Sequence, residues 1–293
     1  MKVIVGALCL ALFVAVYAEE VAPEDFLPTA VDYHTRFGIP RAEAIKKWED
    51  ENYDRIVNER IVGGWHVDIS HVPYQAGLII HLHGTNSVSI CGASLINHYR
   101  LITAAHCWGS NVSGVTIVLG SNMIFHGGHR VWTNNIALYP GWNPSNLHGD
   151  IAVLRTALVG NVIQPIGLPY GEETWWNWHG WTGRASGFGA THNGAGIPND
   201  QRLSAVDLPI LNRDDCARFY GHWFHSNNIC TSGYGGRGTC GGDSGGPLTV
   251  HSHGRNVLIG ATSYGYGGNG GCQAGHPAVY AFITPFIGWI WSV

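Results

Sequence analysis

Short apolar runs alternate with polar, turn-forming stretches along most of this 293-residue chain. The runs are rich in branched residues, and Gly, Asn, Ser and Pro stand between them, which is typical of β-strands joined by turns. The ranges with this character are 76–80, 87–90, 101–104, 115–119, 151–154, 203–209, 247–250, 257–261 and 278–283. The pattern predicts an all-β sandwich or barrel.

Three segments favour helices instead. Asn212, followed by Asp214 and Asp215, offers an N-cap and an acidic first turn for a helix that continues through 216–220. The C-terminal stretch 284–293 has Pro285 near its start and apolar residues at helical spacing. A short polar helix is compatible with 41–53. We therefore expect a β-protein with a few peripheral helices.

The N-terminus differs from the rest of the chain. Residues 1–18 carry a positive charge at Lys2, continue with an apolar stretch too short to span a bilayer with its flanks, and end at the small residue Ala18. These features predict a secretory signal peptide, with a buried N-terminal helix as the alternative. We expect a secreted, extracellular product without a membrane segment.

Residues 19–60 are rich in charged residues and contain no cysteine. The segment ends at Arg60, and residues 61–64 read IVGG, so a tryptic cut after Arg60 would create a new N-terminus at Ile61. A linker or tail is the plain interpretation; a removable activation pro-segment is the sharper one. Residues 61–293 are then long enough for one large domain with its own core.

Cysteine usage agrees with export. Cys9 would leave with the signal, and six cysteines remain, an even number that suits an oxidising compartment. They are Cys91, Cys107, Cys216, Cys230, Cys240 and Cys272. Fifteen pairings are open to six cysteines, and spacing alone does not choose among them.

Three segments carry the candidate chemistry. Residues 240–247 read CGGDSGGP, which places Ser244 on a glycine-flanked turn where its hydroxyl can be exposed. Residues 103–107 read TAAHC and residues 150–154 read DIAVL. Ser244, His106 and Asp150 are the residue types of a nucleophile, its base and the group that orients the base. Taken singly, each also suits a structural role, as a capped serine, a core histidine or a solvated aspartate.

With these motifs, the chain resembles the chymotrypsin-like serine endopeptidases, and among them the insect digestive and brachyurin-like members. The resemblance spans 61–293 and rests on residues 61–64, 103–107, 150–154, 240–247 and the SYG at 263–265, in the family's order. It implies two packed six-stranded antiparallel β-barrels with a C-terminal helix and a cleft between the barrels. It also implies the disulfides Cys91–Cys107, Cys216–Cys230 and Cys240–Cys272.

The resemblance also implies roles for individual residues. His106, Asp150 and Ser244 would be catalytic, and the backbone N–H groups of Gly242 and Ser244 would form the oxyanion hole. Ser263 would support Asp150, and Ser263, Tyr264 and Gly265 would form the edge that pairs with the substrate backbone. Tyr264 departs from the family, in which tryptophan is usual.

Activation would depend on Asp243. After a trypsin-like protease cuts at Arg60, the new ammonium group of Ile61 would pair with the Asp243 carboxylate and order the oxyanion loop, because a buried unpaired carboxylate is costly. A second Arg-Ile-Val sequence begins at Arg55. It lacks the following glycines, so it is not interpreted as the activation site.

Specificity would depend on the pocket for the side chain before the cut bond. Gly238 maps to its base with Thr239 beside it, and Gly265 and Ala278 map to its walls. None of these residues is a carboxylate, so a Lys or Arg side chain would enter unpaired. We expect cleavage after Phe, Tyr or Leu, with Ala278 narrowing the slot. Elastase-like or collagenase-like cleavage is the alternative within enzymes, and an inactive protease-like adaptor is the alternative outside them.

The charge balance limits the partners. Residues 61–293 contain no lysine, and their arginines and acids are equal in number, so this part carries no basic excess. A neutral domain argues against nucleic acid, and the expected partners are protein or peptide substrates, a trypsin-like activator and protein inhibitors. We expect a monomer without cofactor or metal, because residues 119–122 lack the acidic calcium ligand common in the family. The absence of lysine favours an alkaline medium such as a gut lumen, with chance drift in composition as the alternative.

Overall fold

The structure is a computed structural model that describes residues 26–58, 67–160, 163–193 and 202–293. The predicted signal peptide at 1–18 and the junction between Arg60 and Ile61 lie outside the described residues. Among the described residues, no helix combines the length and apolar character needed to cross a membrane.

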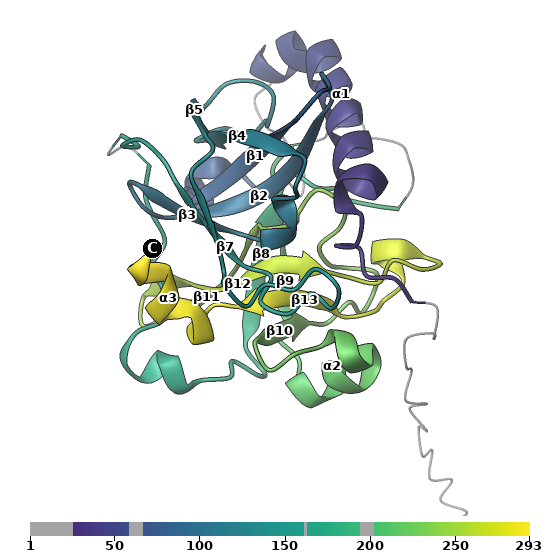
Figure 1. The fold of residues 1–293 in the computed structure, drawn as a ribbon, viewed down its shortest axis with the longest axis vertical. Helices are drawn as coiled ribbons and strands as arrows, with labels where there is room; N and C mark the ends of the chain where they lie inside the picture. Colours follow the sequence, from purple (N-terminus) through teal and green to yellow (C-terminus); the bar gives the residue numbers. More distant parts are fainter. Residues whose placement is uncertain (1–25, 59–66, 161–162, 194–201) are drawn as a thin grey trace, which may run out of the picture.

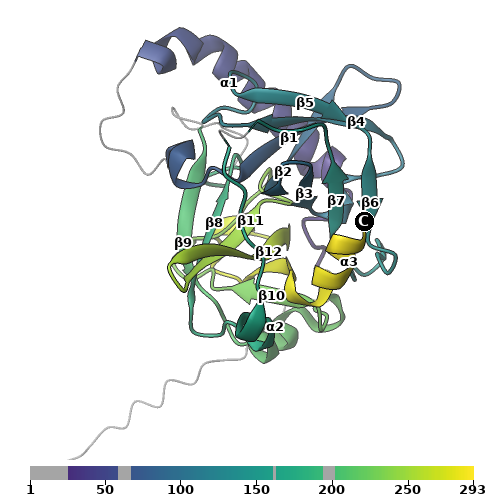
Figure 2. The same ribbon diagram turned by 90° about the vertical axis from the view of Figure 1, so that its left-hand side faces the viewer.

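Two antiparallel sheets make up the body of the molecule (Figures 1 and 2). The first contains seven strands in the order β5-β4-β1-β2-β3-β7-β6, and the second contains six in the order β10-β13-β12-β11-β8-β9. The strands of the first sheet are β1 Gln75–Leu82, β2 Val88–Asn97, β3 Arg100–Thr103, β4 Val112–Leu119, β5 His129–Thr133, β6 Ile136–Leu138 and β7 Ala152–Arg155. Those of the second are β8 Thr182–Gly187, β9 Ser204–Pro209, β10 Asn228–Thr231, β11 Pro247–Ser252, β12 Arg255–Tyr264 and β13 Ala278–Phe282.

The first sheet curls into a barrel because one bent stretch of chain forms both of its edges. Strand β5 pairs with β4, whereas β6, which starts three residues after β5 ends, pairs with β7 on the opposite edge. Asn134 and Asn135 break the stretch, and the Asn135 carbonyl accepts a hydrogen bond from the Arg155 N–H. When 129–138 is counted as one bent strand, the first barrel has the predicted six strands. The two-barrel fold is confirmed.

Each barrel has its own apolar core, and a third core lies between the two. Cys91, Leu101 and Ile117 belong to the core of the first barrel, and Leu248, Ile259 and Tyr280 to that of the second. The shared core joins residues of both barrels, among them Ile90, Ile102, Phe188 and Leu258. Burying aliphatic groups on both faces of a strand is the main driving force for such packing, at roughly 25 cal/mol per Å² of apolar surface. The junction between the barrels is therefore a rigid place on which to mount side chains.

The three predicted helices are present, and one of them is longer than predicted. Helix α2, Arg213–Tyr220, begins after Asn212, whose side chain accepts a hydrogen bond from the Asp214 N–H as predicted. The C-terminal helix α3, Ile287–Ser292, follows a single 3-10 turn. Helix α1, Ile39–Asn58, is longer than the predicted polar helix over 41–53.

Helix α1 and the chain before it lie against the body of the molecule. In both ribbon views α1 (purple) runs beside the first barrel, and the chain that leads into it passes at the level of the junction between the barrels (Figures 1 and 2). Ala42 and Ile45 of α1 are buried in the shared core. The helix is therefore amphipathic, with an apolar face on the barrels and most of its charged residues outside; Glu49 is buried.

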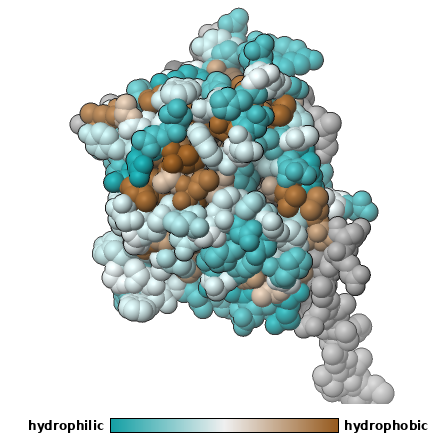
Figure 3. Space-filling model, viewed as in Figure 1, coloured by the Kyte–Doolittle hydropathy of each residue, from teal (hydrophilic) through white to brown (hydrophobic). Residues whose placement is uncertain are grey.

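Apolar residues that remain on the surface are scattered. On the face shown in Figure 3, hydrophobic residues form several separate patches, and hydrophilic residues cover most of the lower half. Large exposed side chains such as Trp132, Trp175 and Tyr234 come from different elements and loops. Scattered apolar side chains of this kind are normal on a folded domain.

Three disulfides cross-link segments of the two barrels. The structure forms Cys91–Cys107, Cys216–Cys230 and Cys240–Cys272, the pairing that the resemblance implies. The first ties β2 to the turn that carries His106, and the third ties the loop before Ser244 to the loop after β12. Cross-links of loops this long typically stabilise a fold by about 2–4 kcal/mol each.

Candidate active site

His106 and Asp150 form a buried hydrogen-bonded pair. His106 Nδ1 lies 2.7 Å from Asp150 Oδ2, and the His106 backbone N–H donates to Asp150 Oδ1 over 2.8 Å. Asp150 has no exposed surface, and the Ser263 hydroxyl donates to its Oδ2 over 2.5 Å. An ionised carboxylate can only accept, so the shared proton is on Nδ1 and Nε2 is left as the acceptor. This arrangement fixes the imidazole in one orientation.

Ser244 lies on the turn between the two barrels. Its carbonyl accepts a hydrogen bond of 2.6 Å from the Gly92 N–H in β2, and the next residue, Gly245, donates to Thr262 O in β12 over 2.7 Å. Gly245 has a φ of +79°, and a Cβ there would come within 2.4 Å of the Gly92 carbonyl oxygen. Only glycine fits this turn, which explains the glycine after the serine.

Two observations place Ser244 beside His106. Cys107 Sγ lies 3.7 Å from the Ser244 carbonyl oxygen and 4.0 Å from His106 Nε2. Tyr33, from the segment before α1, contacts both residues: its ring packs edge-on against the His106 ring at 5.0 Å between centroids, and its hydroxyl interacts with the Ser244 side chain. The structure thus brings Ser244, His106 and Asp150 together from three distant parts of the sequence.

The Gly242 N–H points at the same place. Gly242 has a φ of +104°, and a Cβ on it would lie 2.9 Å from the Gly189 Cα. Its backbone N–H interacts with the Tyr33 hydroxyl, next to Ser244. A backbone N–H beside a serine hydroxyl is the kind of donor that an oxyanion hole needs, and the contribution of the Ser244 N–H stays a prediction.

Asp243 is a buried carboxylate held by backbone groups. It accepts hydrogen bonds from the Gly189 N–H at 2.8 Å and the Cys240 N–H at 2.9 Å. Burial raises the pKa of Asp243 to about 6, while those two hydrogen bonds and the nearby Arg41 guanidinium lower it. The raised pKa shows that these partners do not fully offset the cost of burying the charge.

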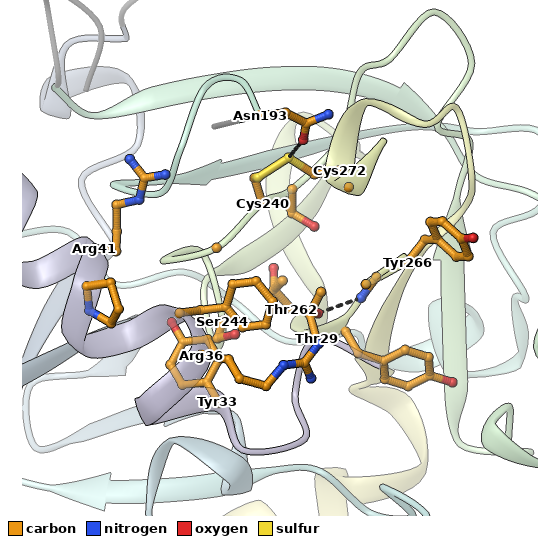
Figure 4. A pocket seen from close by; sticks show the side chains of 18 of the residues that line it. Thr29, Tyr33, Arg36, Arg41, Asn193, Cys240, Ser244, Thr262, Tyr266 and Cys272 are labelled. Atoms are coloured by element: carbon orange, nitrogen blue, oxygen red, sulfur yellow. Dashed lines mark hydrogen bonds between the residues drawn. A yellow bond between two sulfur atoms is a disulfide. The ribbon is translucent and has the colours of Figure 1, made fainter. Parts of the chain in front are cut away.

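A cavity of about 480 Å³ opens beside Ser244. The barrels line it with Ser244, Thr239, Ser263, Tyr264 and Gly265. The N-terminal segment lines it with residues that include Thr29, Tyr33 and Arg41 (Figure 4). The ionisable groups in the lining are those of Tyr33, Arg36, Arg41, His192, Tyr264 and Tyr266. No carboxylate is among the described residues that line this cavity.

The remaining pocket residues lie as follows. Gly238 and Ala278 are outside the cavity lining; a Cβ on Gly238 would meet open space, and Ala278 is buried in β13. The Thr239 side chain interacts with the buried Tyr280 hydroxyl. Arg237 donates to the Asp207 carbonyl oxygen over 3.0 Å and is exposed, so it turns away from the pocket.

Tyr264 forms an aromatic wall with a fixed hydroxyl. The side chain is 1% exposed, and its hydroxyl donates to the Trp223 carbonyl oxygen over 2.7 Å. Burial raises its pKa well above the ordinary value, so it stays neutral. The hydrogen bond fixes the ring of Tyr264 beside the cavity.

The described residues offer little to a metal ion near the site. Cys91, His106 and Cys107 are the one described group of such side chains close enough to share an ion, but both sulfurs belong to a disulfide. In the loop at 119–122, the Asn122 amide bridges the Ile69 N–H and Asp68, and the Ser121 hydroxyl donates to the His126 carbonyl. The absence of calcium stays a prediction.

Sequence reasoning missed the N-terminal segment as part of this site. Tyr33, Thr29 and Arg41 contribute to the cavity, and Glu49 of α1 is buried with both oxygens on backbone N–H groups of Ile124 and Phe125. Burial raises the pKa of Glu49 to about 7, against these hydrogen bonds. Ala42, Ile45 and Trp48 follow one another at three-residue spacing, and this apolar stripe was the available signal that 41–53 packs on something.

The fold and the geometry define a two-barrel hydrolase of the serine type. The trypsin family model matches residues 61–290, and the chain belongs to that family. It is 36% identical over 238 residues to serine protease 1 of Drosophila melanogaster, which covers 80% of this chain and 85% of that protein. It is 32% identical over 242 residues to brachyurin of Leptuca pugilator, covering 78% and 96%.

Solved structures give the same result. The structure of HL collagenase superimposes with a TM-score of 0.69 at 30% identity, and the match covers 79% of this chain and 97% of that one. The chain is therefore a trypsin-family serine protease, an endopeptidase that acts on proteins.

Proposed function

We propose that this chain is the secreted zymogen of a digestive endopeptidase that cuts after large apolar residues. Residues 1–18 are its signal peptide, 19–60 its activation pro-segment and 61–293 its protease domain. The observation that carries the catalytic part is the buried His106–Asp150 pair, supported by Ser263, beside the Ser244 turn.

The proposed reaction follows from this geometry. Ser244 Oγ attacks the peptide carbonyl carbon while His106 Nε2 takes the hydroxyl proton, and the Gly242 and Ser244 N–H groups stabilise the oxyanion. His106 then gives that proton to the leaving amine as the C–N bond breaks. Water, activated by the same imidazole, hydrolyses the acyl-enzyme and regenerates Ser244. Asp150 keeps Nδ1 protonated and stabilises the imidazolium.

Substrate preference is proposed from the cavity lining. Thr239, Gly265 and the Tyr264 ring offer neutral groups, and no acidic side chain is available among the described lining residues for a Lys or Arg. A peptide library treated with the activated enzyme is expected to show cuts dominated by Phe, Tyr and Leu. Dominant cleavage after Arg would contradict the assignment, and dominant cleavage after small residues, or of native collagen, would favour the elastase-like or collagenase-like alternative. Relatives named collagenase and brachyurin keep that alternative open.

The pKa of Asp243 supports the proposal that the uncut chain is a zymogen. In the uncut chain its pKa of about 6 lies above the ordinary 3.8, so the folded protein holds a proton that the unfolded chain has released. This contribution to the free energy of unfolding is complete below pH 3.8 and is lost as the pH rises through 6, about 3 kcal/mol in all at 1.36 kcal/mol per pKa unit. A new ammonium group at Ile61 would offset that loss.

The uncut chain is therefore expected to show a pH-dependent stability that depends on Asp243. Urea unfolding of Ser244→Ala, with and without Asp243→Asn, should give free energies whose difference changes by about 2 kcal/mol between pH 4 and pH 7. The Ser244→Ala background prevents self-cleavage. Parallel pH profiles for the two proteins would show that Asp243 needs no cation.

We also propose an alkaline digestive lumen as the working site. Its support is the absence of lysine from 61–293, because arginine keeps its charge at pH values where lysine loses it. The Ile61 ammonium sets an upper limit, since the active form is lost as the pH climbs through the raised pKa of that group. A pH–rate profile that collapses by about pH 9 would remove this part of the proposal.

A further inference from the structure

We propose that residues 26–53 form a built-in inhibitor that closes the active site and remains bound after the bond between Arg60 and Ile61 is cut. Release of this inhibitory segment would then be a second, separate step of activation. The inference rests on the proposed function, because it assumes that Ser244 and the Gly242 N–H are the groups that act on substrate.

Tyr33 fills the place where the reaction would occur. Its side chain is 3% exposed, and its hydroxyl donates to the Ile90 carbonyl over 2.7 Å while interacting with the Ser244 side chain and the Gly242 N–H. The ring lies edge-on against His106, and Figure 4 shows Tyr33 and Ser244 side by side. A substrate carbonyl oxygen would need the position that this phenol oxygen holds.

Thr29 occupies the neighbouring edge in the manner of a substrate. Its backbone N–H donates to the Gly265 carbonyl over 3.3 Å, and the Gly265 N–H donates to the Thr29 hydroxyl over 2.9 Å. Phe26, three residues earlier, stacks on Tyr266 with 5.5 Å between centroids and 4° between planes. The segment thus uses the groups with which a peptide would add as an extra strand.

The segment blocks the site without being cut at this point. What meets Ser244 is a phenol hydroxyl, which has no carbonyl carbon for the serine to attack. After Tyr33 the chain turns into a helical stretch, 34–38, in which the His34 ring bonds the Ser89 hydroxyl at 2.8 Å. The backbone is therefore coiled where a substrate would have to be extended across the catalytic serine.

Helix α1 anchors the segment outside the cleft. Ile45 is 1% exposed and lies in the core shared by the barrels. Glu49 accepts hydrogen bonds from the Ile124 and Phe125 N–H groups at 2.9 and 2.8 Å, and Asp50 pairs with His126 at 2.8 Å. These anchors hold the segment in place independently of Tyr33.

All of these contacts lie upstream of Arg60. Hydrolysis of the bond between Arg60 and Ile61 removes none of them, but it turns an intramolecular contact into an association between two chains. The effective concentration of the segment, on the order of millimolar while it is tethered, then falls to its actual concentration. Cut protein at high concentration is therefore expected to stay inhibited and to become active on dilution or after digestion of the segment.

The test uses the full chain cut at Arg60 by a limited amount of trypsin, with the cut verified by mass spectrometry. Size-exclusion chromatography should show the segment eluting with the domain. Activity on a Phe-containing chromogenic peptide should rise at least about tenfold per active site when the cut protein is diluted from micromolar to nanomolar concentration. Active sites are counted by phosphonate labelling after the segment has been removed.

Variants in the segment make the test specific. Tyr33→Phe removes one buried hydroxyl, so it is expected to weaken retention about tenfold, and Tyr33→Ala should do so more strongly. Uncut Tyr33→Ala should stay inactive, because it lacks the Ile61 ammonium. Lys47→Ala, on the exposed face of the same helix, is the matched control and should behave as the unmodified chain.

Failure of this inference is distinguishable from failure of the proposed function. Immediate full activity on cutting at Arg60, independent of dilution and equal in Tyr33→Ala, would overturn the inhibitor while leaving the protease intact. Rapid hydrolysis of the segment within 26–53 by the domain itself would also overturn it. No activity in cut, segment-free protein would instead contradict the proposed function.

Discussion

Asp150→Asn is expected to lower kcat by about 10⁴ with little change in KM, which is the loss that this substitution causes in the reference serine protease of the triad mechanism. Asp150 is fully buried and accepts three hydrogen bonds, from the His106 ring, the His106 backbone and Ser263. An asparagine amide can donate to Nδ1, which moves the imidazole proton to Nε2. His106 then cannot accept the Ser244 proton. Steady-state kinetics of the activated, segment-free variant measures this.

Two control substitutions give reference values for the loss of activity at Asp150. Ser263→Ala removes one hydrogen bond from Asp150 and leaves the His106 pair intact, so a loss of about tenfold is expected. Asp207→Asn changes an exposed aspartate that pairs with Arg184 on the second sheet, and activity should not change. A loss at Asp150 no larger than that at Ser263 would show that Asp150 does not orient the base.

Arg60→Gln is expected to abolish activation by trypsin and to leave a precursor at least about 10²–10³ below the activated chain in kcat. That range is the loss expected from one missing oxyanion donor. Without the cut, the partners of Asp243 among the described residues are the Gly189 and Cys240 N–H groups and the nearby Arg41 guanidinium. The oxyanion loop then lacks the buried ion pair that would hold it.

The measurement is activity on the library-derived peptide before and after trypsin treatment. Arg55→Gln, which removes the second Arg-Ile-Val sequence, is the matched control and should activate normally. Full activity of the uncut Arg60→Gln protein would contradict the zymogen proposal. The same result would also exclude closure of the cleft by the inhibitory segment in the uncut chain.

Much of the fold and the centre of the site were predictable from the sequence. Apolar runs marked nine strands, because residues such as those at 76–80 and 257–261 are branched and bounded by turns. Strand β8 was missed because Thr182–Gly187 holds two glycines and an arginine, and its strand character comes from pairing with β9 and β11. Strand β10, Asn228–Thr231, was missed because it holds only two apolar residues, Ile229 and Cys230, and so shows no apolar run.

The N-terminal segment could not be placed from the sequence. The polar residues of 41–53 indicated a helix, but nothing local reveals that Glu49 meets a loop 75 residues later or that Tyr33 meets Ser244. Such contacts depend on how two folded surfaces fit together. The lining of the cavity also comes from both the barrels and the segment. Gly238 and Ala278, which were assigned from their positions in the family, lie outside this lining.

The most direct test of the central claim is covalent labelling of the activated, segment-free protein with a serine-directed phosphonate, followed by peptide mass spectrometry. The account predicts one adduct, on Ser244, that disappears in His106→Ala and blocks peptide hydrolysis in proportion to its yield. Hydrolysis that continues when Ser244 is fully labelled, or labelling of Ser244 at an unchanged rate in His106→Ala, would contradict it.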